Sequence, residues 1–390
     1  MDYEQIPARR LHGSVGIVQT HYAHFNDPLM LKSGQMLDRF TLAYETYGTL
    51  NADRSNAILV CHALSGDAHA GGYHSDDPHE PPGWWDSAIG PGKMFDTSRY
   101  FVICSNVIGG CRGSTGPASL APGGEPYGLR FPVVTVRDMV EAQRRLIDYL
   151  GITQLWAVAG GSMGAMQALE WGVAFPDRAA NVLFIASTPR STPLNVALNE
   201  VGRQAIYNDP RWNEGAYYHQ RVRPTGGLAV ARMLGHISYM SDAAFERKFG
   251  RRYQFGDEPG YSFDTDFAVE SYLKHQGEKF NQRFDANSYL YITKALDYFN
   301  IADGYGSLES ALSRLHAGVL IVTFSSDWLY PPQASIEMAR VLSRLDKRVE
   351  HYHVDADHGH DSFLLEVNRM DEIVSGFLDR AHAEANSTAA

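Results

Sequence analysis

The sequence contains little cysteine, and this limits the ways in which the chain can be stabilised. Only Cys61, Cys104 and Cys111 occur among 390 residues, a number that is too small, and odd, for a disulfide framework. Cys61 and Cys104 lie inside apolar runs, where a thiol usually packs as a small inert side chain. We therefore expect both thiols to be buried and the compartment to be a reducing cytoplasm.

Long apolar runs are absent too. The longest, such as residues 57–61, have the length of a strand and are far shorter than the roughly 20 residues of a membrane-spanning helix. Residues 1–7 include early acidic side chains and are followed by no apolar stretch, so they do not resemble a signal peptide. Both observations predict that the protein has no membrane partner.

Positive charge is in deficit. The chain carries 34 Lys and Arg against 45 Asp and Glu, a formal net charge of −11. This balance argues against a nucleic-acid partner, and any anionic ligand must be met by a local group of cations. The 36 Gly and 18 Pro are ordinary for the length, which excludes collagen-like and disordered classes. These properties are typical of a mildly acidic globular enzyme.

Short apolar runs alternate with helical patterns along much of the chain. Most of these runs are continuous rather than alternating, as expected for parallel strands that are covered on both faces. Helices are expected at 136–150, before a possible capping Gly151, and at 163–175, before Pro176. The pattern predicts an α/β fold with a mostly parallel central sheet flanked by helices. The expected strands are 56–62, 100–107, 155–159, 181–186, 319–324 and 349–354.

The alternation stops in the middle of the chain. Residues 188–307 have mostly helical patterns and include an aromatic-rich segment at 289–299, after which the strand pattern resumes. We expect a helical cap inserted between strands, with 1–187 and 308–382 as the two parts of one core. The end of the chain, 383–390, is expected to be a flexible tail.

A Gly-x-Ser-x-Gly motif is the strongest chemical signal. Residues 160–164 read GGSMG, follow an expected strand and precede an expected helix, which is the context of a nucleophile elbow. The glycines are needed because side chains there would collide with the neighbouring strand and helix. Ser162 is therefore the predicted nucleophile, placed at a helix N-terminus that favours a developing oxyanion.

An elbow serine needs an acid and a histidine later in the chain. Asp327 follows the expected strand 319–324, and the loop after 349–354 contains both His358 and His360. The pattern alone does not separate these two histidines. The oxyanion hole needs two backbone amides, for which we expect Met163 and, in the loop after the first core strand, Leu64.

Further motifs extend well beyond the elbow, and together they resemble the homoserine O-acyltransferases, α/β-hydrolase-fold enzymes of methionine biosynthesis. The likeness covers nearly the whole chain. The motifs that carry it are HALSGDAH at 62–69, GWWD at 83–86, IGPGK at 89–93, GGCRGSTGP at 109–117, GGSMGAMQ at 160–167, ARM at 231–233, RFDANSY at 283–289, SDWLYP at 326–331 and GHD at 359–361.

The resemblance implies roles for particular residues. It selects His360 as the base, supports Ser162 as nucleophile and Asp327 as the orienting acid, and implies that Arg232 and Asp361 bind the amino-acid substrate. A zwitterion such as homoserine needs a cation for its carboxylate and an anion for its ammonium group. The activity it implies is double-displacement acyl transfer from acyl-CoA to L-homoserine, by an enzyme without cofactor or metal. A homodimer is expected, with the insert as its contact.

The prediction of the acyl donor depends on a single position. Succinyl-using relatives tend to carry arginine two positions after the triad aspartate, where this chain has Leu329. The segment at 327–331 therefore looks more like the acetyl-using branch, with acetyl-CoA as co-substrate and succinyl-CoA as the alternative donor.

Three other functions are compatible with part of this sequence pattern. An esterase or thioesterase would carry the same triad and pass the acyl group to water. A metalloenzyme is suggested by 16 histidines with groups at 62–79 and 351–360, but no recognised ligand spacing is present and the first group is spread over a long glycine-rich loop. A non-catalytic binding protein would normally have a broken triad, and no candidate is missing here.

Overall fold

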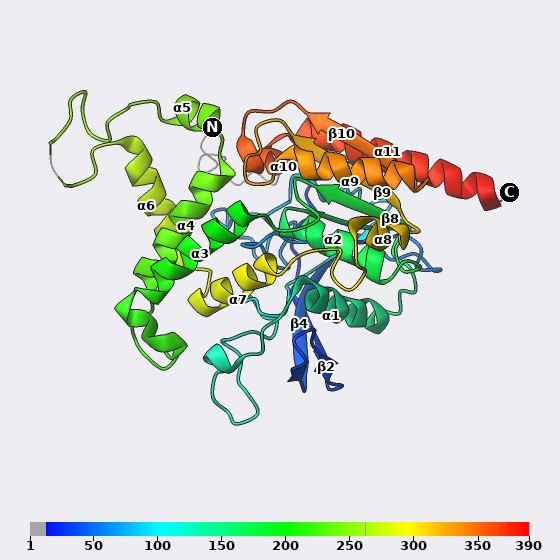
Figure 1. Ribbon diagram of the computed structural model, residues 1–390, viewed down its shortest axis with the longest axis horizontal. Helices are drawn as coiled ribbons and strands as arrows, with labels where there is room; N and C mark the ends of the chain where they lie inside the picture. Colours follow the sequence, from blue (N-terminus) through cyan, green and yellow to red (C-terminus); the bar gives the residue numbers. More distant parts are fainter. Residues whose placement is uncertain (1–12, 262, 390) are drawn as a thin grey trace.

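The computed structural model describes residues 13–261 and 263–389. Its main feature is an eight-stranded sheet in the order β1-β4-β6-β5-β7-β8-β9-β10 (Figure 1). β1 and β4 pair antiparallel, as do β4 and β6, and the other neighbours pair in parallel. The expected mostly parallel sheet is confirmed. The strands are β1 (His21–Phe25), β4 (Phe40–Tyr47), β5 (Ala57–Cys61), β6 (Phe101–Ser105), β7 (Ala157–Gly161), β8 (Asn181–Ile185), β9 (Gly318–Phe324) and β10 (Val349–Val354), beside a small pair β2 (Leu29–Met30) and β3 (Met36–Leu37).

One core strand begins later than the sequence predicts. The apolar run at 155–159 suggests a strand there, but β7 comprises Ala157–Gly161 and so ends on the two glycines of the serine motif. A Cβ at Gly160 would collide with the backbone of Gly164, so only glycine allows the strand to pass this close to the start of α2. The two glycines therefore form the buried end of the strand.

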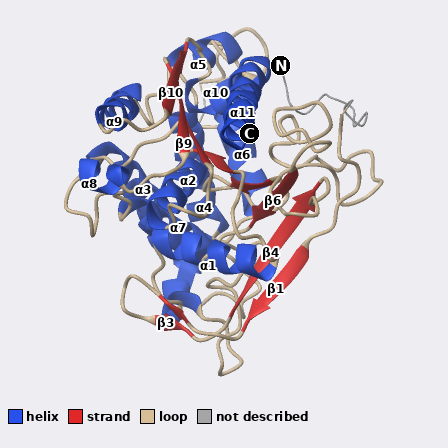
Figure 2. Cartoon of the chain, turned by 90° about the vertical axis from the view of Figure 1, so that its right-hand side faces the viewer, coloured by secondary structure: helices blue, strands red, loops and turns tan. Residues whose placement is uncertain are grey.

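Helices cover both faces of the sheet, as Figure 2 shows. Alternate residues of β5 enter two separate apolar clusters, with Leu59 in one and Val60 in the other. Helices α1 (Val136–Tyr149), α2 (Met163–Ala174), α8 (Leu308–Ser313) and α9 (Pro332–Arg344) contribute to the first cluster, while α10 (Ser362–Leu365) and α11 (Val367–Ala389) contribute to the second. The strand positions are therefore buried on both sides, which explains their continuous apolar sequence.

Local signals set the ends of α1. Thr135 and Asp138 form a capping box at its start, in which each side chain satisfies a backbone amide of the other residue. Gly151 follows the C-cap residue with φ of 69°, a left-handed conformation that glycine adopts without a steric penalty. The sequence prediction of 136–150 thus differs from the helix by its last residue.

Among the described residues, six α-helices stand between β8 and β9 in the chain, and the first five of them gather beside the sheet in Figure 1. α4 packs against both α3 and α6, and α3 also packs against α7. These five helices are α3 (Pro193–Tyr207), α4 (Thr225–Tyr239), α5 (Asp242–Lys248), α6 (Ala268–Asn281) and α7 (Ala286–Asp297), while the short 3-10 helices are η1 (Gly128–Arg130), η2 (Pro210–Gly215) and η3 (Gly359–Asp361).

The C-terminal segment is helical, whereas the sequence analysis predicts a flexible tail at 383–390. The described residues from 383 onward continue α11 to Ala389, and the end of this helix projects from the body in Figure 1. Glu384 in this part of the helix pairs with Arg348, which ties the segment to the residue just before β10. None of the helices in the described part of the chain combines the length and apolar character that crossing a bilayer requires.

Cysteine burial follows the sequence prediction. Cys61 and Cys104 are both buried free thiols. Burial raises the pKa of both groups, which keeps them protonated and therefore weakly nucleophilic. Cys111 is also free and is partly buried.

Candidate active site

Ser162 occupies a sharp turn between β7 and α2. Its φ of 60° and ψ of −126° lie outside the regions that L-residues normally adopt, and such strain costs roughly 1–3 kcal/mol. The Ser162 amide donates to Ile185 O on β8 at 3.0 Å, which anchors the turn to the sheet. The side chain is held at the carboxyl end of β7, with only 8% of the residue exposed.

The glycines around Ser162 are required by close packing. A Cβ on Gly164 would collide with Cys61 O of β5, and one on Gly161 would collide with the Phe363 ring. These contacts bring α2 close to the sheet and leave the serine at the start of the helix. The collision that the sequence analysis expects on both sides of the serine is therefore present in the structure.

His360 and Asp327 form a buried pair at the carboxyl ends of β10 and β9. The Nδ1 atom of His360 lies 2.8 Å from Oδ2 of Asp327, and the amide of Tyr330 donates to the other carboxylate oxygen at 2.9 Å. The structure therefore brings His360, and not His358, to the acid. The side chain of His358 is 34% exposed and lies 3.7 Å from Glu366, whereas the side chain of His360 is 4% exposed.

Opposing effects set the charge of the imidazole. Burial lowers the pKa of His360, but the charge and hydrogen bond of Asp327 and the charge of Asp361 raise it, and the net shift is upward. A raised pKa makes the ring a stronger proton acceptor. Because Asp327 engages Nδ1, the other nitrogen, Nε2, is the one available to accept a proton.

A cavity at the carboxyl edge of the sheet joins several of the predicted residues. Ser162, Leu64 and Leu329 all line it, together with Tyr330 and residues of the helices between β8 and β9. From those helices come Asn195, Leu198, Asn199, Leu234, Gly235, Ser238, Tyr239, Tyr289 and Leu296. The site is therefore shared between the sheet and the inserted helices.

The loop after β5 is held in place by His62. The backbone amide of Val107 donates to Nε2 of His62 at 3.1 Å, so Nδ1 carries the proton and donates to Ala63 O at 2.7 Å. Burial lowers the pKa of His62, which keeps the ring neutral and this tautomer stable. These bonds fix the backbone just before Leu64. Met163 is the first residue of α2, where the amides have no partner within the helix.

Arg232 and Asp361 approach the site from two elements, α4 and η3. Burial raises the pKa of Tyr239, while Arg232 lowers it and Asp361 raises it, so both charges lie near this ring. Burial also raises the pKa of Asp361, although His360 and Arg232 act in the opposite direction. Nη1 of Arg232 is buried and has no hydrogen-bond partner among the described residues. An unsatisfied buried donor of this kind needs an acceptor.

Arg283 is a site residue to which the sequence analysis assigns no role. It donates to Ser65 O at 2.6 Å, and burial and the charge of Arg232 lower its pKa to about 10. The guanidinium carbons of Arg232 and Arg283 lie 4.8 and 5.4 Å from the centroid of the Phe280 ring. Two neighbouring cations repel one another unless an anion lies near them. Arg283 is the first residue of the RFDANSY motif, but only the fold shows that it lies beside α4.

Gly359 allows the histidine loop to pass close to the inserted helices. Its φ is 77°, and a Cβ there would collide with the backbone at residues 239–241. On the other side, Ser326 accepts a hydrogen bond from the Gly359 amide at 2.9 Å, and Trp328 donates to Met240 O at 3.0 Å. The loops that carry Asp327 and His360 are therefore fixed against the end of α4.

Comparison with known proteins places this geometry in a family. Residues 56–367 match the family model described as alpha/beta hydrolase fold. A homoserine O-acetyltransferase of Methanohalobium evestigatum is 54% identical over 370 residues, covering 95% of this chain and 75% of that protein. A homoserine O-succinyltransferase of Acidithiobacillus ferrooxidans is 50% identical over 382 residues, covering 97% of this chain and 98% of that protein.

Solved structures agree with the sequence relatives. The homoserine O-acetyltransferase of Bacillus anthracis superposes with a TM-score of 0.87 at 31% identity, covering 93% of this chain and 98% of that one. The esterase E22 superposes with a TM-score of 0.85 at 30% identity, covering 93% of this chain and 100% of that one. The chain is therefore an α/β hydrolase by fold. Within that superfamily it belongs to the homoserine O-acyltransferase family.

Proposed function

We propose that this protein transfers an acetyl group from acetyl-CoA to the side-chain hydroxyl of L-homoserine through an acyl-enzyme on Ser162. The observation that carries the proposal is the buried His360–Asp327 pair, 2.8 Å apart, at the same sheet edge as the strained Ser162. The proposal is further supported by the positions of Ser162, His360 and Asp327 just beyond the carboxyl ends of parallel strands, where hydrolases of this fold carry their nucleophile, base and orienting acid.

The first half of the reaction forms the acyl-enzyme. Nε2 of His360 accepts the Ser162 proton while the hydroxyl oxygen attacks the thioester carbonyl, and a tetrahedral oxyanion forms. The amides of Leu64 and Met163 donate to that oxyanion. Collapse breaks the carbon–sulfur bond, His360 returns the proton to the thiolate, and CoA leaves. Asp327 stabilises the imidazolium and holds the tautomer.

The second half transfers the acyl group to homoserine. His360 accepts the proton of the homoserine hydroxyl, whose oxygen attacks the ester, and the proton then returns to Ser162 as it leaves. Arg232 would bind the substrate carboxylate, which is supported by its unpartnered buried Nη1. Asp361 would bind the ammonium group. Arg283 adds positive charge beside Arg232, and it contacts the loop that carries Leu64 by donating a hydrogen bond to Ser65 O.

The acetyl donor is favoured by the lining of the cavity. Leu329 supplies an apolar side chain there, and among the described residues that line the cavity none is a cation. A succinyl group carries a free carboxylate, which would be costly to bury in such surroundings without a partner. Because the relatives at about 50% identity include both acetyl- and succinyltransferases, family membership by itself leaves the donor open.

Transfer of the acyl group to water is the second candidate function. It is favoured by the structural likeness to esterase E22 at 30% identity. The inserted helices would favour homoserine over water by enclosing the acyl-enzyme in a narrow cavity. We assign the cap role to residues 188–307, and the core role to 1–187 and 308–382, of which residues 1–12 lie outside the described residues.

One experiment distinguishes these functions. The purified protein is incubated with acetyl-CoA or succinyl-CoA, each with homoserine, serine or water as acceptor, and CoA release and O-acyl product are both measured. We expect multiple-turnover release of CoA only with acetyl-CoA and homoserine. When homoserine is left out, we expect a single equivalent of CoA and an acetyl adduct by intact mass. An acetyl adduct on Ser162→Ala would contradict the mechanism, and multiple-turnover CoA release that is independent of homoserine would identify an esterase.

A homodimer in the cytoplasm fits the remaining features. Apolar side chains are exposed on α3 and α4, including Leu194, Val201, Val230 and Ile237. Such surfaces often mark protein contacts, so the insert is the proposed interface. The three free cysteines suit a reducing compartment. Light scattering coupled to gel filtration tests the assembly, with Val230→Glu expected to yield monomers.

A further inference from the structure

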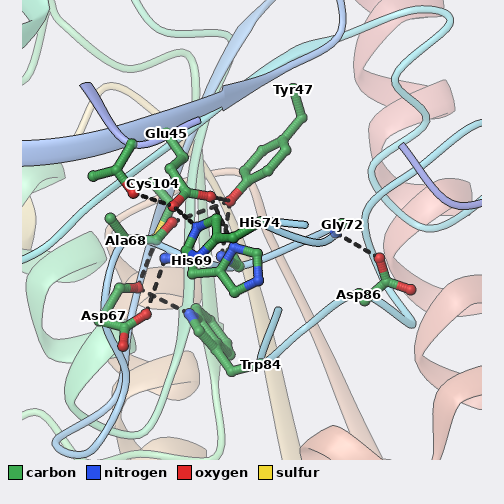
Figure 3. A network of polar contacts seen from close by, with 12 residues as sticks. Glu45, Tyr47, Asp67, Ala68, His69, Gly72, His74, Trp84, Asp86 and Cys104 are labelled. Carbon is green, nitrogen blue, oxygen red and sulfur yellow. Dashed lines mark hydrogen bonds and ion pairs between the residues drawn. The ribbon is translucent and has the colours of Figure 1, made fainter. Parts of the chain in front are cut away.

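A second group of chemically active side chains lies outside the cavity that contains Ser162. Glu45 comes from β4, and His69 and His74 come from the long loop after β5 (Figure 3). Oε2 of Glu45 lies 3.0 Å from Nδ1 of His69, and Oε1 lies 2.7 Å from Nε2 of His74. None of the three takes part in the proposed acyl transfer.

The carboxylate is buried and firmly oriented. Thr20 donates to Oε1 of Glu45 at 2.8 Å, and the hydroxyl of Tyr47 donates to Oε2 at 3.0 Å. The side chain of Glu45 is itself only 1% exposed. Fixed outer hydrogen bonds of this kind are what orient metal ligands in known sites.

The two imidazoles converge on the same carboxylate. Their ring centroids lie 3.8 Å apart, and Figure 3 shows both rings against Glu45. One ligand atom from each of the three residues can be chosen so that all lie within 4.8 Å of one another. Metal–ligand bonds of about 2.0–2.1 Å in a tetrahedral site place the donor atoms about 3.4 Å apart. The three donor atoms, which lie within 4.8 Å of one another, would therefore need to move by at most about 1.4 Å to reach that spacing.

We propose that Glu45, His69 and His74 form a binding site for a divalent transition metal ion of the Zn²⁺ type. Two imidazoles and one carboxylate are a common zinc donor set, and the mixture of nitrogen and oxygen donors disfavours Ca²⁺ and Mg²⁺. On binding, the ion takes the place of the ring protons that now bond the carboxylate. A neutral imidazole that binds the ion carries its proton on the other ring nitrogen, so each ring changes tautomer by proton exchange with solvent.

The site has an entry path and room for a fourth ligand. A cavity of about 280 Å³ is lined by all three residues and by Thr20 and Asp67. The side chain of His74 is 36% exposed, so this ligand can move to admit the ion. Water in the cavity would complete the coordination.

Binding would link β4 to the loop that carries Leu64. His69 lies on that loop, where its amide donates to Asp67 at 3.0 Å, and Trp84 donates to Asp67 O at 3.0 Å. The ion would therefore stabilise the backbone beside the oxyanion hole without entering any step of acyl transfer. This differs from the metal-dependent chemistry that the sequence analysis weighed, and it does not depend on the proposed function.

Metal titration of the tag-free full chain tests the site. Protein treated with a chelator and then dialysed is titrated with ZnCl₂ by calorimetry, and with CoCl₂ by visible absorption. We expect binding of one equivalent, a four-coordinate cobalt spectrum, and a rise in melting temperature with added zinc. His74→Asn and Glu45→Gln should each weaken zinc binding by at least about 10–100-fold, since even outer partners of a metal ligand have effects of that size.

Matched control variants distinguish this site from nonspecific zinc binding by other histidines. His79 lies in the same loop with an exposed side chain, so His79→Asn should bind zinc like the wild type. His351→Asn, which alters the pair of β10 histidines that contact Thr323 of β9, should do the same. His74→Asn changes a partly exposed residue, and its circular dichroism and melting without metal report whether it folds. The proposal is overturned if the wild type shows no saturable binding, or if folded His74→Asn binds zinc as the wild type does.

Discussion

Nδ1 of His360 and Oδ2 of Asp327 lie 2.8 Å apart between two loops that follow neighbouring strands. Both side chains are almost completely buried. The pair therefore depends on the parallel register of β9 and β10, which places Asp327 and His360 beyond the same edge of the sheet. A buried carboxylate with one imidazole and one backbone amide as partners is fixed in position.

Asp327→Asn tests the orienting role of this contact. An amide in place of the carboxylate would favour the wrong imidazole tautomer and remove its negative charge, so kcat should fall by about 10⁴-fold. The stopped assay would follow CoA release with acetyl-CoA and homoserine. Asp357→Asn is the matched control, since Asp357 is exposed and pairs with Arg247, and kcat should stay close to that of the wild type. Equal losses in both variants would argue against the role of Asp327.

Asp361→Asn tests the electrostatics of the base through pH dependence. The base must be neutral to accept a proton, so activity should rise with pH through the pKa of His360, which lies above its ordinary value of 6.5. Since Asp361 helps to raise that pKa, its neutralisation should move the acid limb to lower pH. The pre-steady-state burst of CoA is the right readout, because homoserine takes no part in it.

The control for this experiment is Asp355→Asn. Asp355 is an exposed acid on the same loop, where it accepts a hydrogen bond from Ser325. The acid limb should keep its wild-type position in this variant. A shift of the limb to higher pH in Asp361→Asn would contradict the assignment of charges around His360.

Ser162→Gly tests the backbone strain at the elbow. With φ of 60° and ψ of −126°, an alanine keeps the strain of the serine while a glycine relieves it. After the entropy that glycine adds to the unfolded chain is counted, Ser162→Gly should exceed Ser162→Ala in free energy of unfolding by about 1 kcal/mol. Urea denaturation measures both. Ala168→Gly inside α2 should instead be destabilising, and a Ser162→Gly variant less stable than Ser162→Ala would contradict the strain.

Most of the core follows from the sequence because its signals are local. The strand at 319–324 and the start of α1 depend on an apolar run and a capping box, which neighbouring residues determine. β4 was not predicted, since Thr41, Glu45 and Thr46 interrupt its apolar pattern. The burial of Glu45 depends on His69 and His74, which lie 24 and 29 residues further along the chain. No local pattern contains that information.

The same distinction applies to the site. Ser162 is identified by its own turn, and Asp327 by the strand before it. The pattern of residues does not decide whether His358 or His360 is the base. The two histidines differ in burial and in contact with Asp327, which only the folded chain defines. The contribution of Arg283 depends in the same way on the packing of its side chain near Arg232 and Phe280.

Leu329→Arg tests the choice of acyl donor. Leu329 lines the cavity together with Ser162. Asn195 donates a hydrogen bond to the Leu329 carbonyl at 2.8 Å, which fixes the backbone, so a substitution here changes only the side chain. An arginine there could pair with the free carboxylate of a succinyl group. A charge-assisted hydrogen bond contributes about 1.5–3 kcal/mol, so the ratio of kcat/KM for succinyl-CoA to that for acetyl-CoA should rise by about 10–100-fold. Leu329→Met conserves volume without charge and should keep the wild-type ratio. An unchanged ratio in a Leu329→Arg enzyme that still forms the acetyl adduct would mean that residues elsewhere select the donor.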